Sequence, residues 1–197
     1  MNEKIAEGYY AHVKNEIYEA IRPFITGKSV LDCGCVGNSP EWHDFMKAAS
    51  SEYVGVDLQN EIGLSGIVVD NVETVNLKRK FDAVLAGDML ALVDNQGLFL
   101  DNMRKHLKEG GILIVTHSNC SSLRYRLRGS PFDGFDKACK HNAKTISGLL
   151  SRHGFDVFKT QFFAETSSTF KRRLLKPIFR LKPGLRDWIL IAAKKNG

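Results

Sequence analysis

The sequence contains no long hydrophobic run. None of its apolar stretches approaches the roughly 20 residues that a membrane-spanning helix needs. The first residues, M-N-E-K-I-A-E-G, lack the apolar core of a signal peptide. Cysteine is scarce too: the 197 residues include four, which is not the disulfide framework of a small secreted protein. We therefore expect a reduced, cytoplasmic protein that is long enough for one domain with its own core.

Positive charge is scarce in the first part of the chain, and negative charge is scarce in the last. Residues 1–122 hold 11 Lys and Arg against 17 Asp and Glu, whereas residues 123–197 hold 17 against 5. The net charges are −6 and +12, which give the +6 of the whole chain. Such an asymmetry predicts one surface for a neutral or cationic ligand and another for something anionic. The alternative is a basic surface that only aids solubility.

The N-terminal part is predicted to form one amphipathic helix, over residues 1–26. Its apolar residues recur every four positions, which is the pattern of one buried stripe. They are Ile5, Tyr9, Val13, Ile17 and Ile21. Pro23 is expected to end the helix. Residues 27–197 then form the main domain.

Short apolar strands alternate with helices in the main domain. The strands are expected at 30–31, 53–57, 67–70, 81–86 and 112–115, then at 155–163 and 188–193. One helix starts at Ser39-Pro40, and another ends at a C-cap formed by Gly110-Gly111. A basic connection, 164–187, joins the last two strands, which are expected to pair antiparallel at the sheet edge. The fold class is therefore α/β: a doubly wound, mostly parallel seven-stranded sheet with helices on both faces and an antiparallel last strand pair.

A glycine loop follows the first of these strands. Residues 29–38 read S-V-L-D-C-G-C-V-G-N, so Gly34 and Gly37 stand between a strand and a helix start. Such a loop lets the backbone approach a nucleotide. No Lys-Ser/Thr pair follows, which excludes a P-loop, and G-x-x-G falls short of the dinucleotide pattern G-x-G-x-x-G. Asp32 would repel a pyrophosphate, but it suits a ligand with an ammonium or sulfonium group.

Acidic residues end the next two strands. Asp57 lies 25 residues after Asp32, at a position where a carboxylate can accept both ribose hydroxyl protons. Asp70 ends the third strand, where it can accept from an adenine amino group. A ribose, an adenine, a cationic amino acid and no phosphate together describe S-adenosylmethionine.

The ordered motifs resemble those of the class I, Rossmann-like S-adenosylmethionine-dependent methyltransferases. The resemblance covers about residues 28–195. Their first motif is matched by V-L-D-C-G-C-V-G. The next four are matched, in order, by V-G-V-D-L, I-V-V-D-N-V, F-D-A-V-L-A-G-D-M-L and L-K-E-G-G-I-L-I-V-T. The resemblance implies that these motifs bind S-adenosylmethionine. The implied cofactor-binding residues are Asp32, Cys33, Gly34, Cys35, Gly37, Asp57, Leu58, Asp70, Asn71, Val72, Ala86 and Gly87. Val36 and Asn38 depart from the family, in which glycines usually stand there.

The candidate catalytic residues follow the fourth and fifth strands. Methyl transfer is an in-line displacement that positioning and desolvation accelerate, although an oxygen or nitrogen nucleophile can also need a base. His117 directly follows the fifth strand, and His141 stands before a helix. Asp88 follows the fourth strand, where it is alternatively an N-cap. His12 lies on the N-terminal helix, which in similar proteins often covers the pocket as a lid or cap.

The cysteines do not predict a metal site. A four-cysteine zinc site would show C-x-x-C pairs. This chain has C-x-C at Cys33 and Cys35, with Cys120 and Cys139 apart from them. We expect small buried thiols and no metal.

Several acceptor classes lack their usual motifs. The site after the fourth strand reads A-G-D-M rather than N/D-P-P-Y, which argues against methylation of adenine amino groups. No Pro-Cys nucleophile for cytosine and no paired-glutamate loop for arginine is present. The resemblance then leaves the broad group that methylates small molecules, lipids or saccharides at oxygen or nitrogen. A non-catalytic module with the same fold and an RNA methyltransferase remain alternatives.

The segment 170–186 interleaves apolar and basic residues. Such a segment can rest on an anionic membrane surface. It can also bind RNA phosphates. In the third interpretation it only connects the last two strands and packs over the pocket.

Overall fold

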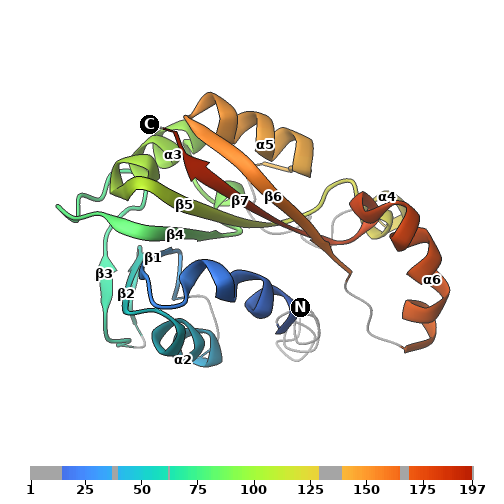
Figure 1. The fold of residues 1–197 in the computed structure, drawn as a ribbon, viewed down its shortest axis with the longest axis horizontal. Coiled ribbons are helices and arrows are strands. Elements are labelled where there is room, and N and C mark those ends of the chain that lie inside the picture. Colours follow the sequence, from blue (N-terminus) through green and yellow to red (C-terminus); the bar gives the residue numbers. More distant parts are fainter. Residues whose placement is uncertain (1–14, 37–39, 62, 129–138, 165–168, 197) are drawn as a thin grey trace.

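A computed structural model describes residues 15–36, 40–61, 63–128, 139–164 and 169–196 (Figure 1). Its centre is one seven-stranded sheet with the strand order β3-β2-β1-β4-β5-β7-β6. The strands are β1 (Ser29–Cys33), β2 (Glu52–Asp57), β3 (Ile67–Val69), β4 (Phe81–Gly87), β5 (Leu107–Ser118), β6 (Phe155–Phe163) and β7 (Trp188–Lys195).

The first five strands run parallel to one another, and β7 alone runs in the opposite direction, between β5 and β6. β7 pairs antiparallel with both β5 and β6. β1 lies between β2 and β4, so the chain runs outward in one direction from β1 to β3 and in the other from β4 onward. The point between β1 and β4 is the switch point at which ligands of such sheets bind. The predicted fold class is confirmed.

Helices cover both faces of the sheet (Figure 1). The helices over the faces are a helix over residues 15–25, α2 (Pro40–Ala49), α3 (Gln96–His106) and α5 (Ala143–Arg152). The structure also describes α4 (Leu123–Arg128), α6 (Thr169–Leu181) and the 3-10 turns η1 (Met89–Ala91) and η2 (Pro183–Leu185). α3 and α5 bury Phe99 and Leu150 in the core of one face. The helix over 15–25 and α2 bury Ile21 and Met46 in the core of the other. Within the described part of the chain, no helix has the length and apolarity to cross a membrane.

One predicted helix end is wrong. α3 ends at His106 rather than at Gly110-Gly111, and the chain enters β5 at Leu107, whose φ and ψ of −89° and 138° are already extended. The glycine pair instead bends the start of that long strand, where Gly110 has φ 69° and the register with β4 shifts. The first helix ends at residue 25, two residues after Pro23 and close to the predicted end at residue 26. It stops before Gly27, whose φ of 68° suits a helix terminus.

Candidate active site

The acids at the ends of β2 and β3 lie next to each other. The backbone N–H of Asp70 donates to the carbonyl of Asp57 over 2.9 Å. The Asp57 carboxylate accepts from the backbone N–H of Val36 over 2.8 Å, which ties the glycine loop to the end of β2. Asp70 and Leu58 are exposed, and Asp57 is half-buried. Both carboxylates therefore stand at the carboxyl edge of the sheet, one of them oriented by the loop after β1.

Gly34 has no room for a side chain. Its φ is 70°, which strains any other residue, and a Cβ placed there would push against the side chain of Met89. Cys33 and Cys35 on either side are buried thiols, as predicted. Of the other loop residues, Val36 is half-buried, while Gly37 and Asn38 lie outside the described residues, as does His12.

Asp32 is buried beneath the loop and held by two aromatic residues. Its Oδ2 accepts from Trp42 Nε1 over 2.8 Å and from the Tyr53 hydroxyl over 3.0 Å. Burial raises the pKa of the Asp32 carboxyl to about 7, and the two hydrogen bonds oppose that rise. The proposed contact with a cofactor ammonium group stays a prediction.

The turn after β4 places Asp88 at the same edge of the sheet. Ala86 is buried and Gly87 half-buried, so both sit at the end of the strand. Asp88 follows in the left-handed region, with φ 57° and ψ 10°, and makes no side-chain cap to η1. Its backbone N–H donates to the carbonyl of Thr116 in β5 over 2.8 Å. A non-glycine residue in this conformation stores strain, which often marks a functional site.

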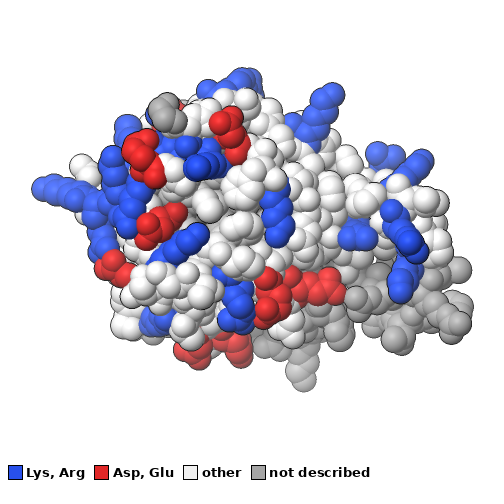
Figure 2. All heavy atoms as spheres, in the orientation of Figure 1, with Lys and Arg blue, Asp and Glu red and all other residues white. Residues whose placement is uncertain are grey.

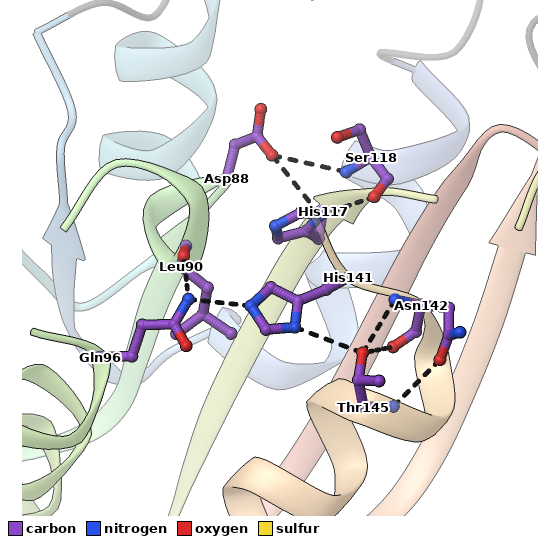
Figure 3. A network of polar contacts seen from close by, with 8 residues as sticks. All are labelled: Asp88, Leu90, Gln96, His117, Ser118, His141, Asn142 and Thr145. Carbon is purple, nitrogen blue, oxygen red and sulfur yellow. Dashed lines mark hydrogen bonds and ion pairs between the residues drawn. The ribbon is translucent and has the colours of Figure 1, made fainter. Parts of the chain in front are cut away.

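His117 lies behind Asp88 (Figure 3). The His117 side chain is 1% exposed, and its Nδ1 is 3.9 Å from Asp88 Oδ1. The same nitrogen lies 2.6 Å from the carbonyl oxygen of Ser118, which can only accept, so Nδ1 carries the hydrogen. The ring of His141 meets that of His117 edge-to-face, with centroids 5.3 Å apart. The structure thus brings together all three predicted catalytic residues.

The protonation state of His141 follows from its neighbours (Figure 3). The Gln96 amide nitrogen donates to the Leu90 carbonyl over 2.5 Å and lies 2.8 Å from His141 Nε2. Nε2 is therefore the acceptor, and Nδ1–H donates to Thr145 Oγ1 over 3.3 Å. This arrangement requires a neutral imidazole. Burial and then the nearby His117 lower the pKa of His141, in agreement with it.

A comparison of the sequence with protein families decides which kind of protein this is. Residues 4–160 match the model of a family described as a methyltransferase domain. The chain belongs to this methyltransferase family. No curated protein matches the sequence.

Solved structures of methyltransferases share the fold. One is the N-methyltransferase NodS from Bradyrhizobium japonicum WM9 in complex with S-adenosyl-L-homocysteine, with TM-score 0.66, 14% identity and coverage of 94% of this chain and 89% of that chain. Another is an S-adenosylmethionine-dependent methyltransferase from Archaeoglobus fulgidus, with TM-score 0.68 and 19% identity. The match covers 99% of this chain and 100% of that chain. A third is a chain in the complex of the Haloferax volcanii Trm112 methyltransferase activator with a methyltransferase, with TM-score 0.71 and 11% identity. The match covers 99% of this chain and 93% of that chain.

The family and the fold confirm a methyltransferase that depends on S-adenosylmethionine. The polar residues at the ends of β2 and β3 fit the nucleoside part of that cofactor. The predicted contacts of Asp57 with ribose hydroxyls and of Asp70 with an adenine amino group need carboxylate oxygens at this edge, and both residues have them there. Gly34 adds no side chain to the loop. Both carboxylates are accessible at the switch-point edge. Within the described residues, no group of three His, Cys, Asp or Glu could hold a metal ion.

Sequence reasoning missed the residues that hold this methyltransferase site together. Trp42 and Tyr53 hold Asp32, while Gln96 and Thr145 hold His141. One signal was readable: Asn142 and Thr145 form a capping box at the start of α5, a spacing that marks a helix start just after His141. Gln96 lies 45 residues from His141 and carries no comparable local signal.

Proposed function

We propose that this methyltransferase transfers the methyl group of S-adenosylmethionine to an oxygen or nitrogen atom of a small-molecule, lipid or saccharide acceptor. One observation carries the proposal: a carboxylate and two histidines, Asp88, His117 and His141, meet where β4 and β5 end (Figure 3). This is the edge at which Asp57 and Asp70 offer the nucleoside contacts. An acid–base cluster beside the cofactor edge suits a protonated nucleophile, which must lose its proton.

Asp88 is the member of this cluster that an acceptor reaches first. Its side chain is 23% exposed, whereas His117 is 1% exposed. The bound cofactor supplies a methyl group activated by a sulfonium centre. The Asp88 carboxylate accepts a hydrogen bond from the acceptor O–H or N–H and orients it. His117 Nδ1–H, at 3.9 Å, stabilises the negative charge of that carboxylate.

The helix α6 supports a lipid or lipid-linked acceptor. In Figure 1, α6 lies beyond the end of the sheet at which β5 ends and β7 begins, with α4 beside it. Its described side chains expose Ile178 and Leu181, by 42% and 83%. Lys176 and Arg180 are exposed on the same helix, which contains no acidic residue. Apolar and basic side chains together on an exposed helix suit an anionic membrane surface.

Calorimetry and turnover test the proposal in sequence. S-adenosylmethionine and S-adenosylhomocysteine should both bind the full chain in isothermal titration, and absence of binding by both would sink the enzyme interpretation. Radiolabelled methyl transfer is then measured with lipid, saccharide, small-metabolite and RNA fractions as acceptors. We expect label in one of the first three fractions, reduced at least tenfold by Asp88→Asn at unchanged cofactor affinity. Binding without turnover in any fraction would favour a non-catalytic module, and label in RNA alone would favour the nucleic-acid alternative.

Vesicle flotation tests the membrane contact separately. Vesicles with about a third of anionic lipid should carry the protein upward, and Ile178→Asp with Leu181→Asp should abolish this. Leu98→Asp on α3 is the matched control, because Leu98 and Ile178 are both 42% exposed. Equal flotation of the two variants would exclude α6 as the contact.

A further inference from the structure

A cavity of about 380 Å³ lies where β4 begins, at the end of the strand opposite to Asp88. Its rim includes Lys78, Arg79, Lys80 and Lys105. β4 has seven residues, which corresponds to about 20 Å at roughly 3.3 Å per residue. The cavity is therefore separate from the methyl-transfer site, and its volume falls in the range of small-molecule pockets.

The wall of this cavity is held in place by buried polar side chains of α3. Asn102 Nδ2 donates to the carbonyls of Val72 and Val75, each over 3.0 Å. His106 Nε2 accepts from the backbone N–H of Leu77 over 3.2 Å, and His106 Nδ1 donates to the Asn102 carbonyl over 2.9 Å. Asn102 and His106 are 7% and 4% exposed. The segment that leads into the basic rim is thus preorganised rather than a loose loop.

The rim carries more positive than negative charge. Arg79 pairs with Glu52 and lies over the ring of Phe81. Within the described residues, no ion pair joins Lys78, Lys80 or Lys105 to an acid. The other acids near this end of the sheet are engaged as well: Asp82 pairs with Lys108, and Glu109 with Lys195. Figure 2 shows Lys and Arg side chains crowded at the left end of the molecule with Asp and Glu between them.

Lys78 is held in an unusual backbone conformation. Its φ is 53°, and its backbone N–H donates to Asn76 Oδ1 over 3.1 Å. Asp88 is the other non-glycine residue with positive φ among the described residues. A lysine in the left-handed region costs free energy that the fold must offset elsewhere. This conformation is found at the edge of a cavity that three lysines and an arginine line.

We propose that this cavity binds a small phosphate-bearing anion, apart from the cofactor and the acceptor. Among the described residues that line the cavity none is a carboxylate, and Thr74 and Asn76 add a hydroxyl and an amide to the four cationic side chains. Ammonium and guanidinium groups beside neutral donors are the chemistry that recognises phosphate oxygens. A bounded cavity favours a compact anion over an extended nucleic-acid backbone.

Isothermal titration of the full chain with inorganic pyrophosphate tests this site. We expect saturable binding that weakens as salt is raised, and an at least tenfold loss of affinity in Lys78→Ala with Lys80→Ala, and in Lys105→Ala. Lys144→Ala with Arg152→Ala is the charge-matched control, because both residues are exposed on α5. It should leave the affinity unchanged.

Two outcomes would overturn the proposal. One is absence of pyrophosphate binding, or an equal loss in the pocket and control variants. The other is binding of a 20-nucleotide RNA, but not of pyrophosphate, that the pocket variants weaken. Cofactor binding is measured in the same samples, so that a pocket variant that has lost its fold is recognised by loss of both ligands. Lys105→Met then repeats the measurement with the aliphatic stem retained.

Discussion

The proposed cofactor half and the proposed acceptor half of the carboxyl edge are built in different ways. In the cofactor half, Asp57 and Asp70 each stand at the end of a strand. The carboxylate of each accepts a hydrogen bond from a nearby backbone N–H group. In the acceptor half, His141 takes its position from Gln96 on a different helix, 45 residues away in the chain. One half is therefore assembled from strand ends that backbone N–H groups hold, and the other from contacts between side chains.

This difference implies different sensitivities to substitution. A change in the cofactor half should act on one contact or one charge, because the strands hold the backbone in place. A change in the acceptor half should spread through the linked bonds of Gln96, His141 and Thr145. Substitutions at four positions test this, in order of decreasing expected change in free energy.

Asp32→Asn should have the largest effect, and it should appear in the pH dependence of stability. The folded pKa of Asp32 is raised from 3.8 to about 7, so its contribution to stability is present below about pH 4 and is lost as pH rises through about 7. The difference between the two values corresponds to about 4 kcal/mol. Asn keeps an acceptor for Trp42 and Tyr53 without the charge. Chemical denaturation should show that the free energy of unfolding of the variant increases relative to that of the wild type between pH 5 and 8.

The control for this titration is Asp156→Asn, an exposed carboxylate on β6. Its stability difference from the wild type should stay flat over the same range. A flat difference for Asp32→Asn would show that the buried carboxylate does not titrate there.

Asp57→Ala should reduce the affinity for S-adenosylhomocysteine about 100-fold, as measured by calorimetry. A carboxylate that accepts two hydroxyl protons contributes hydrogen bonds to a charged group, worth roughly 1.5–3 kcal/mol each at most. Asp57→Asn should lose less, because its amide oxygen still accepts from the Val36 N–H. An affinity change below threefold for Asp57→Ala would contradict the ribose assignment, and Asp156→Ala should have no effect.

The same contrast explains what the sequence could predict. Asp57 and Asp70 could be placed at the carboxyl edge from the sequence, because an acid at a strand end is a local pattern and the parallel sheet brings such ends to one edge. The cofactor contacts of Asp32, Asp57 and Asp70 stay predictions. The end of α3 was misplaced because a glycine pair is typical of a C-cap, whereas here tertiary pairing of β5 with β4 extends the strand across Gly110. The partner of His141 could not be predicted, since nothing local to Gln96 indicates which histidine it will meet.

Gln96→Glu should raise the pKa of His141, because a carboxylate within hydrogen-bond distance stabilises the imidazolium form. In the wild type the pKa of His141 is lowered, so folding favours the neutral ring, and stability falls as pH drops below about 6.5. The stability of the variant should not decrease in this way as pH drops. The His141 Cε1 proton in an NMR titration measures the change directly, and the pH–rate profile should shift with it.

Gln96→Leu separates charge from contact. It removes the bond to Nε2 without adding a carboxylate, so the pKa of His141 should rise less than in Gln96→Glu. Equal shifts in the two variants would mean that the lost contact alone sets the titration. No shift in either variant would show that Gln96 has no influence on the ring.

Asp88→Gly should have the smallest effect on stability and the opposite sign, and it shows how the acceptor half uses strain. Glycine adopts a φ of 57° freely, so relief of the backbone strain should stabilise the fold by up to about 1 kcal/mol. Lys78→Gly, with φ 53°, should give a similar gain in thermal unfolding temperature and so calibrates the backbone contribution. If the gain in unfolding temperature is smaller for Asp88→Gly than for Lys78→Gly, the difference measures the contribution of the Asp88 carboxylate contacts with Ser118 and His117, which glycine removes. Methyl transfer should nevertheless fall at least tenfold in Asp88→Gly, because the orienting carboxylate is gone. A variant that is more stable and still fully active would show that the strained turn serves only the fold.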